Sequence, residues 1–329
     1  MSNMLSLRLV AAGCAAALTL AACGGGSDNG SSGSATPTVS TDTGTPGNSP
    51  VITPAAPVAA GAPALTGDIA TDGLNWFNYR RSQIGISQLS RDSLIDKTGL
   101  NHSNYQKLNN KITHGEEAGK SGFTGVDLPA RFAQAGYVIP TSASYAYGEV
   151  ISATNNKSGV FMAEELITAI YHRFVVFEPM FKEFGGGAAT TSAGYTYFTT
   201  DFAARNGFGT GVAGLVTWPY AGQTSVAPNF FSDYEEPDPV ENINEVGYPV
   251  SVHANINTKV TVQSFTIQPR GGAVLNAKLV YAASDEKSGP SAAAIVPLAP
   301  LNAATVYDVS FNGAVNGAAV TKTWSFTTR

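Results

Sequence analysis

The residues in this sequence with the clearest chemical potential are His172 and Glu165, in the stretch from Ala163 to Gly187. Apolar side chains recur there at three- and four-residue spacing, which predicts one stripe of an α-helix: Ala163, Leu166, Ile167, Ile170, Phe174 and Phe177. At about 100° per residue, His172 projects from roughly the opposite side of that helix. Glu165 lies about two turns earlier on the same side as His172. The pattern therefore predicts a histidine and a carboxylate on one helix face.

A second interpretation of His172 stays open, because Val175 and Val176 share its side and a histidine in an apolar helix is often a satisfied core residue. Pro179 is expected to end the helix. The glycines at 185–187 are expected to let the chain turn.

The N-terminus has the pattern of a processed export signal. Arg8 supplies a positive charge, and the apolar run from Leu9 to Leu20 is too short to span a bilayer. The sequence Leu20-Ala21-Ala22-Cys23 resembles the lipobox of bacterial lipoproteins; the alternative is an ordinary signal peptide with a chance cysteine. We therefore predict a lipoprotein signal peptide over residues 1–22 and a lipid on Cys23, which would hold the chain at a membrane. The absence of aspartate after Cys23 favours the outer membrane, with the chain facing the periplasm or the surface.

Residues 23–66 are rich in Gly, Ser, Thr, Pro and Ala and contain no aromatic residue, so they are predicted to be a disordered tether. As a flexible coil this segment would reach roughly 35 Å. The other cysteine, Cys14, would be lost with the signal, so no disulfide within the mature chain and no cysteine metal site is expected. The net charge of -5 and the 13% charged residues exclude a basic footprint for nucleic acid.

Residues 67–215 are expected to form an α/β unit with helices that begin near Leu74, at a cap formed by Ser90 or Asp92, and at Leu128. His102 lies in the later half of the second helix. A loop with His114, Glu116 and Glu117 follows, which is either exposed or part of a site.

Six short motifs occur in this unit in a fixed order: Leu74-Asn75 through Arg80-Arg81; His102-Ser103-Asn104-Tyr105; the loop with His114; Arg131 to Tyr137; Gly148-Glu149-Val150-Ile151; and His172-Arg173 with Pro179, Phe181, Glu183, Gly185 and Gly187. Their order resembles the bacterial branch of the CAP superfamily, also called SCP or PR-1-like proteins. The resemblance implies an α-β-α sandwich with a cleft on one face.

In that family two histidines and acidic residues converge in the cleft, and some members bind a divalent metal. The resemblance assigns the two histidines to His102 and His172 and the acidic residue to Glu149, and Glu165 is the further candidate from helix facing. Two imidazoles can ligate a metal such as zinc, and a carboxylate can orient one of them or act as a base. We therefore predict that His102 and His172 face one another with Glu149 in hydrogen-bond reach. Val150 departs from the family, which usually has asparagine there.

Residues 216–248 are predicted to be a Pro-rich acidic connector, either solvated or a calcium site at Asp233, Glu235, Glu236 and Asp238. Residues 249–329 alternate apolar and polar side chains in short runs, with a change of register between Val262 and Phe265 that suggests a bulge. The run Pro297 to Leu301, with Tyr307 and the final Trp324, Phe326 and Thr328, resembles bacterial immunoglobulin-like domains, which implies an all-β sandwich. Alternation places His253 on the surface.

Two function classes follow from these features. In the first, the chain is a cell-envelope protein, extracellular or periplasmic, whose CAP cleft binds a small ligand, a lipid or a divalent metal. In the second, the cleft is a metal-assisted hydrolase of peptide or cell-wall material, with a metal-bound water on His102 and His172 and Glu149 as base. The lack of a third strong metal ligand favours binding without catalysis. The partners expected are the membrane and the ligand, with no nucleic acid.

Overall fold

The computed structural model describes residues 16–17 and 61–329, and the chain is a mixed α/β protein with several sheets. Ala16–Ala17 form β1, a two-residue strand. The rest of the predicted signal peptide, Cys23 and residues 24–60 of the predicted tether lie outside the described residues. No helix of the described part is long and apolar enough to cross a membrane.

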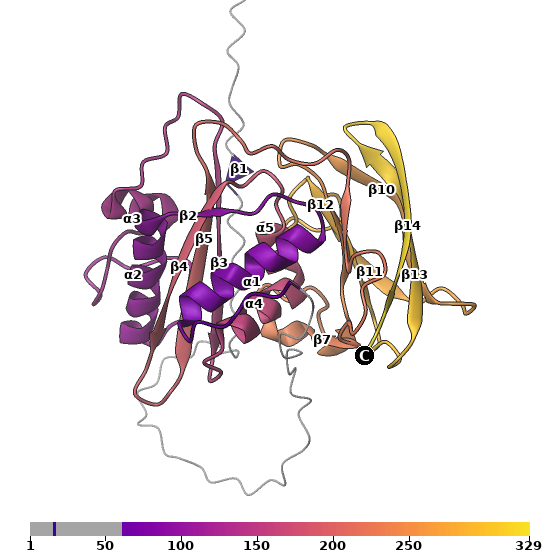
Figure 1. Ribbon diagram of the computed structural model, residues 1–329, viewed down its shortest axis with the longest axis horizontal. Coiled ribbons are helices and arrows are strands. Elements are labelled where there is room, and N and C mark those ends of the chain that lie inside the picture. The colour runs from indigo at the N-terminus through magenta and orange to yellow at the C-terminus, as the bar shows by residue number, and fades with distance from the viewer. Residues whose placement is uncertain (1–15, 18–60) are drawn as a thin grey trace, which may run out of the picture.

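The central sheet has the strand order β1-β3-β5-β4-β2 and carries helices on both faces (Figure 1). Its other strands are β2 (Ser90–Arg91), β3 (Ala146–Thr154), β4 (Glu183–Thr190) and β5 (Thr196–Ala204). Helices α2 (Ser93–Asn109) and α3 (Leu128–Ala135) lie on one side. Helices α1 (Ile69–Gln83), α4 (Gly159–Thr168) and α5 (Ile170–Val176) lie on the other.

The helix starts follow from local sequence. Asp92 caps α2 by accepting from the backbone of Leu94, and Asp127 caps α3 in the same way from Ala130. Gly136 ends α3 in the left-handed conformation, with φ of 95°. The starts of α2 and α3 agree with the sequence-based expectation, whereas α1 begins at Ile69, before the expected start near Leu74, because Asp68 caps it.

The expectation of a single helix after Ala163 is wrong. The helix is interrupted at Ala169, whose extended backbone (φ -66°, ψ 124°) separates α4 from α5. The predicted turn at the glycine run is also wrong, because Gly185 and Gly187 lie inside β4. A Cβ on Gly187 would approach the Cα of Leu100 within 2.3 Å, so the glycines allow α2 to pack closely on the sheet.

The C-terminal half is built from a three-stranded sheet in the order β10-β13-β14 and a four-stranded sheet in the order β11-β12-β9-β6. Their strands are β6 (Val216–Trp218), β9 (Val250–His253), β10 (Val260–Pro269), β11 (Ala277–Tyr281), β12 (Ala292–Pro297), β13 (Val306–Val315) and β14 (Ala318–Thr327). The register of β10 shifts between Val262 and Ser264, which confirms the expected bulge.

The segment predicted to be a connector packs into the structure. Strand β6 pairs with β9, and β7 (Asn229–Phe231) pairs with β8 (Glu245–Gly247), with a 3-10 turn η1 (Ser232–Tyr234) between them. Trp218 is fully buried, and one continuous apolar core runs from α1 through Trp218 to β14. The expectation of a solvated segment is therefore wrong for these residues.

His253 is also buried, with 1% of its surface exposed, so its predicted surface position is wrong. Strand β9 is covered on both faces, and the imidazole packs edge-on against Phe174 and Phe177 of the α5 region. Burial lowers the pKa of His253 to about 3, and the neighbouring Arg173 and Arg81 act in the same direction.

Candidate functional site

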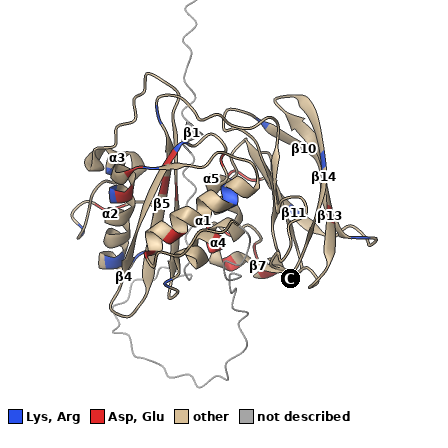
Figure 2. Cartoon of the chain, viewed as in Figure 1, with Lys and Arg blue, Asp and Glu red and all other residues tan. Residues whose placement is uncertain are grey.

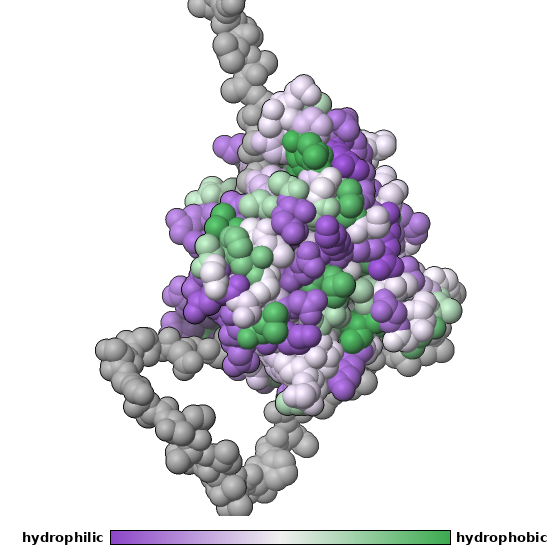
Figure 3. Space-filling view, turned by 90° about the vertical axis from the view of Figure 1, so that its left-hand side faces the viewer, coloured by the Kyte–Doolittle hydropathy of each residue, from purple (hydrophilic) through white to green (hydrophobic). Residues whose placement is uncertain are grey.

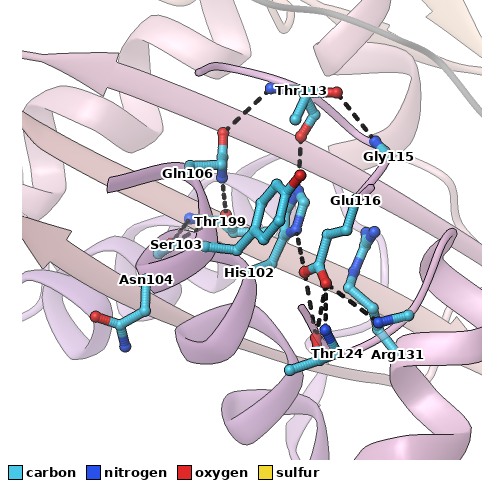
Figure 4. A network of polar contacts seen from close by, with 12 residues as sticks. His102, Ser103, Asn104, Gln106, Thr113, Gly115, Glu116, Thr124, Arg131 and Thr199 are labelled. Atoms are coloured by element: carbon cyan, nitrogen blue, oxygen red, sulfur yellow. Dashed lines mark hydrogen bonds and ion pairs between the residues drawn. The ribbon is translucent and has the colours of Figure 1, made fainter. Parts of the chain in front are cut away.

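The first ionic group on the α2 side of the sheet is formed by His102 and Glu116, which are both fully buried (Figure 4). The Nδ1 of His102 lies 2.8 Å from Glu116 Oε1, and its Nε2 lies 2.6 Å from the carbonyl oxygen of Thr113. Glu116 also accepts from the backbone N–H groups of Thr124 and Gly125. Burial raises the pKa of Glu116, but the hydrogen bonds from His102, Thr124 and Gly125 outweigh it and leave the pKa below its usual range.

These contacts engage both ring nitrogens of His102. A carbonyl oxygen can only accept, so Nε2 carries the hydrogen that it donates to Thr113, and Nδ1 faces the carboxylate of Glu116. Neither ring nitrogen is directed away from a partner within the protein. Because a metal ligand needs a ring nitrogen with a lone pair, this geometry does not suit His102 to the metal role expected from the sequence.

The second group joins His114, Glu149 and Arg131. Nδ1 of His114 donates to Glu149 Oε1 at 2.7 Å, and Arg131 donates to Glu149 Oε2 at 2.6 Å and to the carbonyl of His114 at 2.7 Å. The side chain of Arg131 is fully buried, whereas that of His114 is 19% exposed. Burial raises the pKa of Glu149, but Arg131, His102 and His114 outweigh it and hold the pKa well below its usual range.

This geometry determines the tautomer of His114. Since Glu149 is ionised, Nδ1 carries the hydrogen that it donates to Glu149. A histidine held in this way by a carboxylate has a defined ring orientation, which suits it to contact a ligand or to accept a proton. His114 was predicted only as part of a loop, and here it takes the place beside Glu149 that was expected for His102 or His172.

The third group lies on the other face of the sheet, around His172. Its Nδ1 lies 3.1 Å from Glu235 Oε1, and Glu235 also accepts from the backbone N–H groups of Ile170, Tyr171 and His172. Glu235 is 1% exposed and caps α5, which has no capping side chain of its own. The carboxylate of Glu235, one of the four predicted calcium ligands, therefore caps a helix instead.

Glu165 belongs to this side as well. Its carboxylate accepts from Ser152 at 3.1 Å, and burial raises its pKa against the effects of Ser152 and His172. Along β3 successive side chains alternate between faces, so Ser152 points toward α4 while Glu149 points toward α2 and α3. The four candidates thus divide into His102 with Glu149 on one face and Glu165 with His172 on the other. The expected pairing of His102 with His172 across one cleft is not what the structure contains.

Among residues 16–17 and 61–329, no group of three or more His, Cys, Asp or Glu side chains is arranged to hold a metal ion. Charged positions are scattered, and neither sign gathers over one face in Figure 2. The surface above α2 and α3 alternates polar and apolar areas (Figure 3), with Leu100 and Leu108 among the exposed apolar side chains.

Sequence reasoning missed the roles of three charged residues: Arg131, Asp201, which lies opposite Glu149 on β5, and Glu235, which was expected only as a possible calcium ligand. Arg131 was noted only as part of a motif. Asp201 is an acid between Thr200 and Phe202 in an otherwise uncharged strand, and that position was the available signal for a buried role. Glu235 carried no local signal, because its partners lie more than 60 residues away.

Comparison with solved structures finds distant likenesses. One is an extracellular protein from Bacillus anthracis that contains an SCP domain, with 20% identity and a TM-score of 0.34 over 41% of this chain and 39% of that protein. Another is an outer surface protein from Borrelia burgdorferi, with 14% identity and a TM-score of 0.34 over 40% of this chain and 90% of that one. No protein-family profile and no curated protein matches the chain. The likenesses are too distant to carry an argument about the site.

Proposed function

We propose that this chain is an exported cell-envelope lipoprotein with a CAP-type unit, and that this unit binds a small ligand without catalysing a reaction. The sequence supports this reading through the lipobox before Cys23 and through the ordered motifs of residues 67–215. The two sheets formed by residues 249–329 together with β6 then act as an immunoglobulin-like spacer.

The observation that carries the binding role is the partly exposed His114 at the end of an otherwise buried ionic group. Glu149 and Arg131 are almost or fully buried. Glu149 bonds the ring at 2.7 Å, and Arg131 donates to Glu149 at 2.6 Å and to the backbone carbonyl of His114 at 2.7 Å. A ligand that reaches His114 meets a preoriented imidazole that costs little to order on binding. The ligand contact in this proposal is therefore His114, with Glu149 and Arg131 as its supports.

The hydrolase alternative finds less support in the donor set. It was built on His102 and His172 sharing a metal. Both ring nitrogens of His102 are instead engaged by Glu116 and Thr113, and His172 bonds Glu235 on the other face of the sheet. A catalytic zinc site commonly uses three protein ligands. His114 with Glu149 could still act as a base, so catalysis has to be tested directly.

The test follows the ring resonances of the four histidines by NMR during titration with three probes: zinc chloride, phosphatidylglycerol vesicles and soluble peptidoglycan fragments. Binding at the proposed site moves the His114 signal, leaves that of the buried His253 in place, and is weakened at least tenfold in His114→Ala. The peptidoglycan sample is also analysed for products. Cleavage that depends on His114 would replace the binding role by the hydrolase, and a His114 signal that responds to none of the probes would contradict both.

A further inference from the structure

Asp201 is a buried acid for which the hydrogen bonds described above provide no partner. It lies on β5 directly opposite Glu149 of β3, and its exposed fraction is 0%. Neither carboxyl oxygen accepts a hydrogen bond from any group in the described part of the chain. An ionised carboxylate in this position would be desolvated without compensation beside a second negative charge.

A proton between the two carboxyl groups removes this conflict. Cross-strand neighbours have Cβ atoms about 4.5–5.5 Å apart, so the two carboxyl groups can meet. Glu149 already accepts from His114 and Arg131, both of which require an acceptor, so the proton belongs to Asp201. Burial raises the pKa of Asp201 well above its usual value, the charge of Glu149 adds to this, and Arg131 opposes it.

The other elements around Asp201 make no hydrogen bond to it within the described residues, although Nε of Arg131 is also buried there without an acceptor. On β4 its neighbour is Gly185, which has no side chain. The charged groups on this side are His102 from α2, Arg131 from α3, and Glu116 and His114 from the loop between them, and each makes the contacts already given. With a neutral Asp201, Arg131 and Glu149 form a balanced ion pair beside His114.

We propose that Asp201 is a positioning residue: it stays protonated in the folded chain and donates its O–H to Glu149, which in turn orients His114. The carboxylate that holds the imidazole then accepts three hydrogen bonds, from His114, Arg131 and Asp201. The functional meaning of this arrangement rests on the proposed ligand contact at His114. The proton on Asp201 does not, so it is tested without any ligand.

The first experiment compares the unfolding equilibria of the unmodified chain and of Asp201→Asn between pH 5 and pH 7. Asparagine is isosteric, neutral and able to donate to Glu149. The folded chain keeps the Asp201 proton, whereas the unfolded chain releases it above its pKa of about 3.9. The unfolding constant of the unmodified chain should therefore rise about tenfold per pH unit relative to that of the variant, or about 100-fold from pH 5 to pH 7.

A ratio that stays constant over that range would mean that Asp201 is ionised in the folded state, and it would overturn the proposal. Asp233→Asn, at an exposed position, is the matched control and should show no such slope. Asp201→Ser, a second neutral donor, serves if the asparagine variant does not fold.

The second experiment tests positioning through the NMR signals of the His114 ring in the absence of ligand. They should stay in place in Asp201→Asn, which keeps a donor to Glu149, and move in Asp201→Ala, which does not. Unchanged His114 signals in the alanine variant would overturn the positioning role. Because neither experiment contains a ligand, a failure of the ligand-binding proposal leaves both results interpretable.

Discussion

The carboxylate of Glu235 provides the clearest test of how the two halves of the chain depend on each other. It accepts from the backbone N–H groups of Ile170, Tyr171 and His172 at 2.7, 2.6 and 3.2 Å, and it contacts the His172 ring. Loss of a helix cap costs about 0.5–2 kcal/mol. Hydrogen bonds to a charged group contribute roughly 1.5–3 kcal/mol each, without full additivity. We therefore expect Glu235→Ala to lower the free energy of unfolding by about 3–5 kcal/mol.

The assay is urea unfolding followed by far-UV circular dichroism, with linear extrapolation to water. At a slope of about 3 kcal/mol per molar urea, the midpoint should fall by 1 M or more. Glu236→Ala is the matched control: it removes the same charge from the next, exposed position and should change stability by less than about 0.5 kcal/mol. A Glu235→Ala variant within about 1 kcal/mol of the unmodified chain would refute the capping argument.

Three further predictions concern other sites. Burial raises the pKa of the Glu178 carboxyl to about 8, so between about pH 4.5 and pH 8 the folded chain holds a proton there that the unfolded chain releases. The free energy of unfolding should therefore fall as pH rises through that window. Urea unfolding at pH 5 and pH 8 should show that this fall is absent in Glu178→Gln. His102→Ala leaves the carboxylate of Glu116 buried without its partner and should cost about 3–5 kcal/mol in the same assay. An unchanged midpoint would disprove the role of this buried contact in stability. Cys23→Ser should move the protein from the membrane fraction to the soluble fraction on cell fractionation, and continued membrane retention would count against the lipid anchor.

The charged groups could be predicted from the sequence only in part. His102, Glu149 and His172 were singled out because the motifs carry them, and each is indeed buried in an ionic contact. Their partners were not predictable in the same way. Glu149 meets His114 across 35 positions of the chain, and no local spacing encodes which of the four histidines folds back onto it.

The sequence by itself determined the features that depend on neighbours within a few residues. Asp92 and Asp127 begin helices because their oxygens reach N–H groups two or three residues ahead, and Gly136 ends one because it tolerates a left-handed backbone. The alternation of β10 and its bulge are local in the same sense, since side-chain direction changes at each residue.

Only the tertiary structure decided which polar groups bond to one another and where some helices and strands begin and end. The stripe from Ala163 to Phe177 is continuous in sequence, yet the helix breaks at Ala169, where a carboxylate from Glu235 satisfies the N–H groups of a new helix end. The glycine run at 185–187 became strand because α2 approaches too closely for side chains there. In both cases the deciding contact is made with a segment distant in sequence: a buried hydrogen bond in the first and close packing in the second. A local sequence pattern could therefore not predict it.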